Sequence, residues 1–215
     1  LDAVKKHGLV ITGIWGDYRI KAFDSFNSVG ELKKKDFDMI LLTVKSYDTA
    51  SAMTEILPLM TEKTMLVSFQ NGLGDIETVL GKGVKPENYL VGRVIFGVEL
   101  EPGVAKITVN ADDVRLGALP DVQTRLSPFQ AAQLFNTAKI PTQAVPNILT
   151  YIWAKVIYNC ALNGICSLNE IPYGKILEKA ETREAMERIV RECYAVGSKK
   201  GIVLDPPLAE DFDAL

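Results

Sequence analysis

Residues 150–171 read TYIWAKVIYNCALNGICSLNEI, and this stretch does most to decide the fold. It is largely apolar and long enough to be a helix rather than a strand. Three polar residues interrupt it at steps of four, namely Lys155, Asn159 and Asn163. Steps of four in a helix place side chains above one another on one face. The stretch therefore predicts an apolar helix that carries one polar stripe.

The polar stripe of Lys155, Asn159 and Asn163 has two interpretations. In one, the lysine reaches solvent and the asparagines cap neighbouring backbone groups. In the other, which the apolar flanks such as Trp153 and Leu162 favour, the stripe forms the wall of a pocket for a small polar anion. An unsatisfied buried amide costs roughly 1–3 kcal/mol, so a polar ligand would have to fill such a gap. Lysine can hold a carboxylate or protonate a developing alkoxide, and asparagine can donate and accept hydrogen bonds.

The composition limits the classes of protein to consider. The 215 residues suffice for one large domain or two small ones, and an apolar content of 47% supports a real core. A formal net charge of −3 argues against a nucleic-acid surface. No apolar run is long enough to span a bilayer, and the first residues do not resemble a signal peptide. We therefore expect a cytoplasmic protein without membrane or nucleic-acid partners.

Cysteine and histidine usage agrees with that expectation. Cys160, Cys166 and Cys193 are odd in number and lack Cys-x-x-Cys spacing, so we expect reduced thiols. His7 is the sole histidine and lies among charged residues. This argues against a histidine-based zinc site and against a Ser-His-Asp triad, and no metal site is predicted.

The first part of the chain alternates between strand and helix patterns. Such alternation predicts a doubly wound parallel sheet, and the apolar runs 37–44 and 64–69 suit strands covered on both faces. The predicted strands are 8–13, 18–23, 37–44, 64–69, 89–97, 104–109, 114–119 and 140–145. The predicted helices of this part are a short one that begins after Asn27 or Ser28 and runs through Leu32, followed by 48–57, 75–80 and 127–138.

Two polar side chains follow neighbouring strands of that sheet. Lys45 comes directly after the run 37–44, and Asn71 closely follows the run 64–69. Ligands of doubly wound sheets lie off the carboxyl ends of the strands. Lys45 therefore suits a phosphate or a carboxylate, unless it is an ordinary solvated lysine. The sequence Asn-Gly-Leu-Gly at 71–74 suits a close approach of backbone to a cofactor, unless it is an ordinary turn.

Beyond Pro146 the pattern changes to helices alone. Residues 150–169 and 181–200 predict two helices. The sequence therefore predicts an α/β fold with two domains, a sheet domain over 1–146 and a helical domain over 147–215.

With these residues in view, the chain resembles the ketopantoate reductase (2-dehydropantoate 2-reductase) family. The most specific shared feature is the pattern Trp-x-Lys-x-x-x-Asn-x-x-x-Asn at 153–163. Residues 44–45, the turn at 70–74 and the segment 92–103 match in the same order. The resemblance implies a Rossmann-like parallel-sheet domain that binds NADP, followed by an all-α domain, with the active site in the cleft between them.

The resemblance also implies a reaction and its site. The reaction is the NADPH-dependent reduction of 2-dehydropantoate (ketopantoate) to pantoate in pantothenate and coenzyme A biosynthesis. The site residues implied by motif are catalytic Lys155, substrate-binding Asn159, Asn163 and Asn71, and cofactor-binding Lys45, Asn71 and Val98. A sister reductase for another 2-oxo acid, or a non-catalytic Rossmann-like binding module, is the alternative. A homodimer is left open.

Three departures from the family pattern bear on these expectations. The Gly-x-Gly-x-x-Gly fingerprint is absent, so we expect the sheet domain to be incomplete at its N-terminus. The family's later serine and glutamate have no counterpart before Leu215, so we expect the helical domain to be incomplete at its C-terminus. Tyr173 stands where the family often has an asparagine. The simplest expectation is a piece of a longer polypeptide that is inactive alone, because a parallel sheet without its central strands would expose apolar surface.

Overall fold

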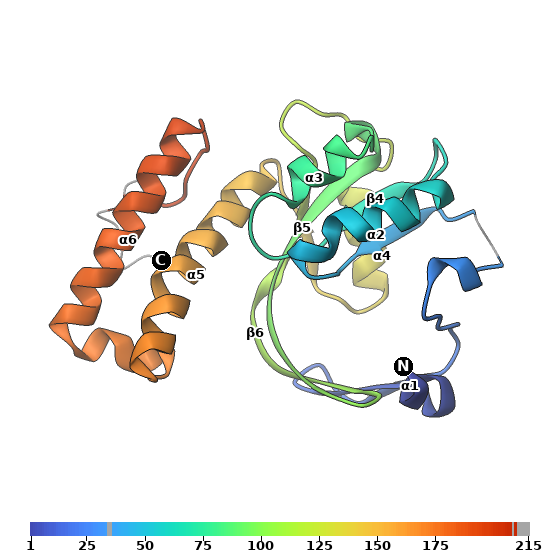
Figure 1. Ribbon diagram of the computed structural model, residues 1–215, viewed down its shortest axis with the longest axis horizontal. Helices are drawn as coiled ribbons and strands as arrows, with labels where there is room; N and C mark the ends of the chain where they lie inside the picture. The colour runs from blue at the N-terminus through green and yellow to red at the C-terminus, as the bar shows by residue number, and fades with distance from the viewer. Residues whose placement is uncertain (34–35, 208, 210–215) are drawn as a thin grey trace. The chain divides into compact units, whose positions relative to one another are not determined.

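The protein divides into two compact units. The computed structural model describes residues 1–33, 36–207 and 209. The units are Leu1–Pro146 and Asn147–Leu215. The strands lie in the first unit, and the second unit is built of helices (Figure 1).

The elements confirm the predicted succession of an α/β sheet region and a helical region. The strands are β1 (Leu9–Gly13), β2 (Tyr18–Ile20), β3 (Met39–Leu42), β4 (Met65–Ser68), β5 (Tyr89–Glu101), β6 (Val104–Gly117) and β7 (Thr142–Ala144). The α-helices of the first unit are α1 (Asp2–His7), α2 (Thr49–Ile56), α3 (Asp75–Gly81) and α4 (Pro128–Thr137). Its short 3₁₀ helices are η1 (Val29–Glu31), η2 (Ser46–Asp48), η3 (Leu57–Leu59) and η4 (Pro86–Asn88). The second unit consists of α5 (Ile148–Asn169), η5 (Tyr173–Glu178) and α6 (Ala180–Lys199).

The sheet is mixed rather than wholly parallel. Its strand order is β2-β1-β6-β5-β4-β3, and β7 pairs with β6. The strands β3, β4 and β5 are parallel, as predicted, whereas β5 and β6 are antiparallel. Helices α2 and α3 lie on one face of the parallel part and α4 on the other (Figure 1). Because Val67 and Leu90 of the strands pack with Phe135 of α4, a main core of this unit lies under α4.

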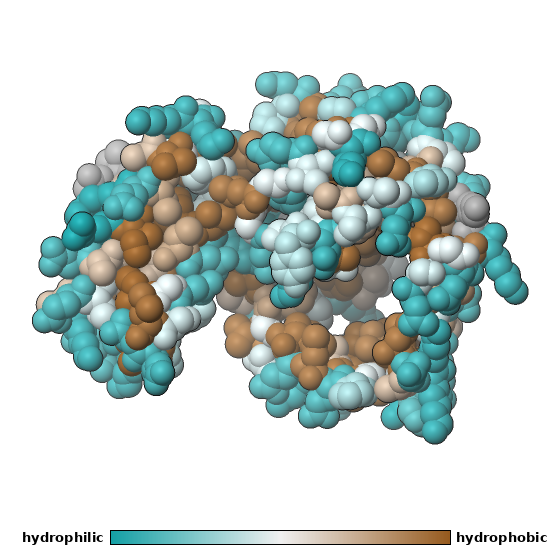
Figure 2. All heavy atoms as spheres, viewed as in Figure 1, coloured by the Kyte–Doolittle hydropathy of each residue, from teal (hydrophilic) through white to brown (hydrophobic). Residues whose placement is uncertain are grey.

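The predicted burial of both faces holds for β4 but is wrong for β3. All four residues of β4 are buried. In β3, by contrast, Leu41 is 47% exposed. The reason is that β3 is the edge strand of the described sheet, where neighbouring elements cover it incompletely. Figure 2 shows further apolar side chains on the surface of this unit, and Leu100 and Val109 of the β5–β6 ribbon are among the exposed residues.

The largest difference from the prediction concerns β6. The sequence predicts two strands, 104–109 and 114–119, joined through the polar residues 110–113. Instead, β6 is one continuous strand from Val104 to Gly117. Its pairing with β5 shifts in register three times, which accommodates the polar residues within the strand. A polar cluster that looks like a turn in the sequence is therefore a bulged part of a strand.

Two arginines hold Asp112 within β6. The carboxylate lies 2.5 Å from Arg93 Nη2 and 2.7 Å from Arg115 Nη2. Arg93 is buried, so the carboxylate supplies the opposite charge that a buried guanidinium requires. Burial raises the pKa of Asp112, but the hydrogen bonds and charges of Arg115 and Arg93 outweigh it and lower the pKa to about 2. These ion pairs explain why the polar segment remains in the sheet.

The second unit is held together by the packing of α5 on α6. Trp153 and Ile157 of α5 share a buried cluster with Val190 and Tyr194 of α6. A second cluster joins the C-terminal half of α5 to η5 and α6. The predicted helix over 150–169 is thus present in α5 and begins two residues earlier than expected. None of the helices in the described residues is long and apolar enough to cross a membrane.

The Asp112 ion pairs predict an acid-dependent contribution to stability. Because the pKa of Asp112 is lower in the folded protein than in the unfolded chain, its contribution is complete above about pH 4 and is lost as the pH falls toward 2. We expect Asp112→Asn to lower the free energy of unfolding by about 2 kcal/mol at neutral pH. The measurement is urea unfolding across this pH range. The difference between variant and parent should shrink toward pH 2, and a constant difference would contradict the ion-pair account.

A matched control for this experiment is Asp17→Asn. Asp17 is an exposed carboxylate between β1 and β2. Since exposed surface charges contribute little to stability, this variant should unfold like the parent throughout the same pH range.

Candidate functional site

The polar stripe lies along one helix, α5. Lys155 and Asn159 are half-buried, and Asn163 is exposed. The apolar residues of α5 pack against α6, so the rotation of α5 about its axis is fixed and the stripe cannot turn into the core. One ammonium and two carboxamides on a rigid helix can jointly hold a carboxylate and a ketone oxygen.

The structure adds Tyr173 to this stripe. Its hydroxyl donates a hydrogen bond to Asn163 Oδ1. Its ring packs edge-on against Tyr158, with the ring centroids 6.2 Å apart. In the sequence, Tyr173 is notable only as a departure from the family pattern. Its contact with Asn163 depends on η5, which returns the chain to α5, and no local sequence signal reveals that return.

Lys45 and Asn71 occupy equivalent places on neighbouring strands. In the parallel pair of β3 and β4, the last paired residues are Leu42 and Ser68. Lys45 and Asn71 each follow three residues later, at the carboxyl end of the sheet where ligands of such folds bind. Both residues are exposed. Their placement therefore offers one cation and one carboxamide to a ligand at this end of the sheet.

Gln70 ties these two connections together. Its Nε2 donates to the backbone oxygen of Val44 at 2.9 Å and to Thr49 Oγ1 at 2.7 Å. Thr49 Oγ1 in turn donates to the backbone oxygen of Ser46 at 2.8 Å. The segment that carries Lys45 is thereby fixed to the residue before Asn71. The roles of Gln70 and Thr49 were not predicted from the sequence, where the one signal is the position of Gln70 directly before the Asn-Gly turn.

The turn after Gln70 rests on a buried polar cluster. Ser68 Oγ donates to Asp75 Oδ2 at 3.3 Å and lies 2.7 Å from the Tyr89 hydroxyl. Burial raises the pKa of the Asp75 carboxyl, although backbone N–H groups and Ser68 oppose that shift. Burial also raises the pKa of Tyr89. Gly74 is the N-cap of α3. These buried hydrogen bonds thus hold the turn in place.

The glycines of this turn leave room for a ligand. Gly72 and Gly74 have φ angles of 98° and 99°, in the left-handed region that glycine tolerates best. A β-carbon on either would meet no atom within 4 Å. The backbone is therefore open to close approach, and the exposed ammonium of Lys45 suits a phosphate. These residues fit a dinucleotide cofactor.

The remaining predicted cofactor residue, Val98, is on the next strand of the sheet. It is in β5, seven residues beyond Val91, the last residue of β5 paired with β4. Asn71 is only three residues beyond Ser68, the partner of Val91. Lys45 and Asn71 thus hold equivalent places on neighbouring strands, and Val98 lies farther beyond the paired part of its own strand.

A cluster of metal-binding side chains is absent from the described residues. Within residues 1–33, 36–207 and 209, the histidine, cysteine, aspartate and glutamate side chains do not gather in groups of three that could hold a metal ion.

Family comparisons match both units. The family model described as ketopantoate reductase PanE/ApbA matches residues 1–121. The model described as ketopantoate reductase PanE/ApbA C terminal matches residues 147–214. These matches confirm the resemblance predicted from the sequence.

Individual relatives agree with the family models. The 2-dehydropantoate 2-reductase of Aquifex aeolicus (strain VF5) is 34% identical over 193 residues, which are 88% of this chain and 60% of the relative. The 2-dehydropantoate 2-reductase of Pyrococcus abyssi (strain GE5 / Orsay) is 31% identical over 100% of this chain and 69% of the relative. The chain therefore spans less than two thirds of the Aquifex protein.

A solved structure shares the fold. The ternary structure of D-mandelate dehydrogenase with NADH and anilino(oxo)acetate has a TM-score of 0.83 to this chain at 23% identity. The match covers 97% of this chain and 66% of that one. At this identity the likeness concerns the fold, which confirms the α/β sheet region followed by a helical region.

The Gln70 contacts predict how a single change alters the first unit. Gln70→Leu removes two hydrogen bonds that hold the segment around Lys45, each contributing about 1 kcal/mol. We expect the amide hydrogens of Asp48 and Thr49 to exchange with solvent about tenfold faster, because this segment opens more often. Hydrogen exchange measured by NMR or mass spectrometry checks this result.

The control for this variant is Gln133→Leu, because Gln133 is exposed on α4. It should leave the exchange of Asp48 and Thr49 as in the parent. Equal exchange rates in Gln70→Leu and the parent would show that the segment is held by other contacts.

Proposed function

Because the chain belongs to the ketopantoate reductase PanE/ApbA family, we propose that the whole protein reduces the ketone of a 2-oxo acid with a nicotinamide nucleotide. The observation that carries this proposal is the stripe of Lys155, Asn159 and Asn163 along α5. A 2-oxo acid presents a carboxylate and a ketone oxygen on adjacent carbons. One cation and two carboxamides on a fixed helix match those groups.

In this proposal the substrate is ketopantoate, the product is pantoate and the cofactor is NADPH. The names of the Aquifex and Pyrococcus relatives support this choice of substrate. The reaction takes place in the cytoplasm as a step of pantothenate and coenzyme A biosynthesis. Residues 1–146 form the NADP-binding domain and residues 147–215 belong to the substrate domain. A homodimer is compatible with this assignment.

Lys155 carries the chemical step. When bound, the nicotinamide nucleotide supplies the hydride for the ketone carbon. Negative charge then develops on the ketone oxygen, and an ammonium beside that oxygen stabilises the charge and gives it a proton. Asn159 and Asn163 orient the substrate so that this geometry is reached before reaction. Lysine suits both tasks because its charge and its transferable proton are on one nitrogen.

The cofactor is assigned to the first unit. The open turn with Gly72 and Gly74 lets backbone approach the dinucleotide, and Lys45 places a positive charge for a phosphate. Asn71, between these features, contacts both cofactor and substrate. Val98 would contribute backbone to the cofactor from β5, the strand next to β4.

A second candidate is a sister reductase for another branched 2-oxo acid. The specific observation in its favour is Tyr173, which occupies a hydrogen-bonding position of Asn163. The fold does not decide between substrates, since it is shared with a D-mandelate dehydrogenase. Substrate preference therefore depends on side chains around the stripe.

The test is NADPH oxidation by the whole protein with ketopantoate as substrate. Lys155→Ala should lower kcat by about a hundredfold to ten-thousandfold, because it removes the proton donor. The Kd for NADPH, measured by fluorescence titration, should change by no more than about threefold, since a group acting on the transition state contributes little to ground-state binding.

The control is Lys199→Ala, which removes an exposed lysine at the end of α6 and should retain the parent kcat. A Lys155→Ala protein with the parent kcat would exclude Lys155 from the mechanism. A parent protein that oxidises no NADPH with any 2-oxo acid would contradict the proposed function.

A further inference from the structure

Two cysteine thiols meet where α5 packs on α6. Cys160 lies on α5 and Cys193 on α6, and the thiol of Cys193 forms a hydrogen bond with that of Cys160. Cys160 is exposed and Cys193 is half-buried, so a small reagent in solvent reaches the pair from the side of Cys160. The sequence predicts reduced thiols without a paired spacing, because this pair forms between two helices and not within one motif.

The packing of the two helices holds the cysteines together. Cys193 packs against the buried cluster that contains Trp153 and Ala161 of α5, and Cys160 directly precedes Ala161. The helices also approach each other closely one turn beyond Cys193. A β-carbon placed on Gly197 of α6 would lie only 3.3 Å from the ring of Trp153. The contact between the thiols therefore belongs to a close and extensive helix pair.

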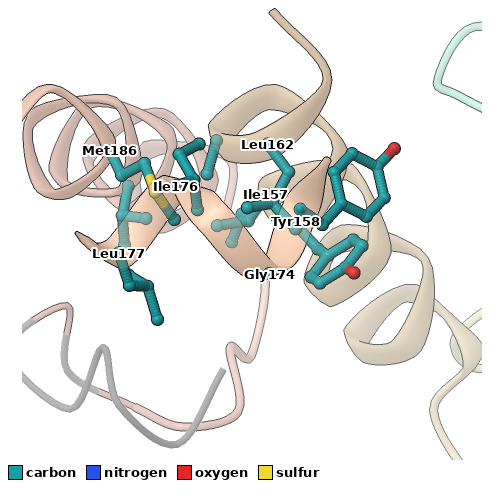
Figure 3. Close-up of a pocket in the computed structure, with 10 residues that line it drawn as sticks. Ile157, Tyr158, Leu162, Gly174, Ile176, Leu177 and Met186 are labelled. Carbon is teal, nitrogen blue, oxygen red and sulfur yellow. The ribbon is translucent and has the colours of Figure 1, made fainter. Parts of the chain in front are cut away.

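This helix pair is not closely packed throughout. A cavity of about 350 Å³ lies between α5, η5 and α6, and Ile157 and Val190 from the cluster around the cysteines line it. Figure 3 shows the cavity, with Leu162 on the α5 side and Ile176 and Met186 across from it. A disulfide bond brings two sulfur atoms closer than a hydrogen bond does. Close-packed interiors resist such a movement, so the cavity provides room for it.

The two thiols have different chemical roles. Burial raises the pKa of Cys193 to about 11, and the charge of a Cys160 thiolate and the hydrogen bond to Cys160 act in the same direction. Cys193 is therefore a protonated thiol at neutral pH and donates its S–H to the sulfur of Cys160. Thiolates, not thiols, attack disulfides, and access to solvent also controls the rate. The exposed Cys160 is thus the member of the pair that reacts first.

We propose that Cys160 and Cys193 are a modification site, at which a low-molecular-weight disulfide converts the two thiols into a reversible disulfide bond between α5 and α6. The Cys160 thiolate attacks one sulfur of the small disulfide, forms a mixed disulfide and releases one thiolate. Cys193 then loses its proton and attacks the sulfur of Cys160, which releases the second thiolate. The two cysteine thiols are oxidised to one disulfide, and the small disulfide is reduced to two thiols that take up the two protons.

The disulfide would strengthen the contact that fixes α5, the helix of the polar stripe. It closes a loop over residues 160–193 and so restricts the unfolded chain, which stabilises the folded helical unit. The stability of this unit would thereby respond to the balance of thiols and disulfides around the protein. This inference goes beyond the proposed function and does not depend on the substrate.

The test treats the whole protein with excess oxidised glutathione and maps its unreduced peptides by mass spectrometry. We expect one cross-link, between the peptide with Cys160 and the peptide with Cys193, which dithiothreitol removes. In the oxidised protein, the amide hydrogens of the helical unit that exchange only through its unfolding should exchange on the order of a hundredfold more slowly than in the reduced protein. Both measurements use the parent protein, so they do not depend on the folding of a variant.

Two variants identify the pair. Cys193→Ser removes the second thiol, so its reaction should stop at the mixed disulfide of Cys160 with glutathione. The matched control is Cys166→Ala, because Cys166 is a buried cysteine of the same helix outside the pair. This variant should form the same cross-link as the parent.

Several results would overturn the proposal. One is a parent protein whose Cys160 stays reduced or remains joined to glutathione. Another is a cross-link between two molecules, or between Cys160 and Cys166. Equal exchange rates in the oxidised and reduced protein would show that the disulfide does not stabilise the helical unit. The reductase function can be measured separately on the reduced protein, and it stands or falls independently of these results.

Discussion

The packing of α5 against α6 is the constraint on which the candidate chemistry depends. A long apolar helix has no preferred rotation until one face is buried. Here Trp153 and Ile157 are buried against Val190 of α6, and this contact fixes the direction of every other side chain of α5. Lys155, Asn159 and Asn163 then form a stripe whose geometry is set before any ligand binds. Such preorganisation is what electrostatic catalysis requires, because the charges need no rearrangement during reaction.

In the first unit, hydrogen bonds rather than helix packing hold the candidate ligand groups in place. Its candidate ligand groups lie on connections rather than on a helix, and connections are mobile unless tied down. Gln70 donates hydrogen bonds to Val44 and Thr49, and the buried hydrogen bond between Ser68 and Asp75 holds the turn. These hydrogen bonds fix the backbone of the turn, while its glycines leave free space for a ligand.

Patterns that depend on near neighbours in sequence could be predicted. The spacing of Lys155, Asn159 and Asn163 was enough to place them on one face of a helix, and the apolar run 64–69 was enough to place β4 in a covered sheet. The bulged course of β6 could not be predicted. Its polar residues resemble a turn, and the ion pairs of Asp112, one of them with Arg93 of another strand, explain why the strand continues. For the same reason the contacts of Gln70 and of Tyr173, made across turns and between strands, left no local signal.

Under the proposed function, the whole protein transfers a hydride to the ketone carbon of a 2-oxo acid. The most direct measurement uses the whole protein with NADPH deuterated at the nicotinamide carbon that donates the hydride, and follows the product from ketopantoate by NMR. The account predicts deuterium on the carbon of pantoate that bears the new hydroxyl group, with one stereoisomer formed. Two results would contradict it. One is turnover that leaves this carbon unlabelled although both hydrogens on the donating nicotinamide carbon are replaced by deuterium, and the other is no oxidation of NADPH.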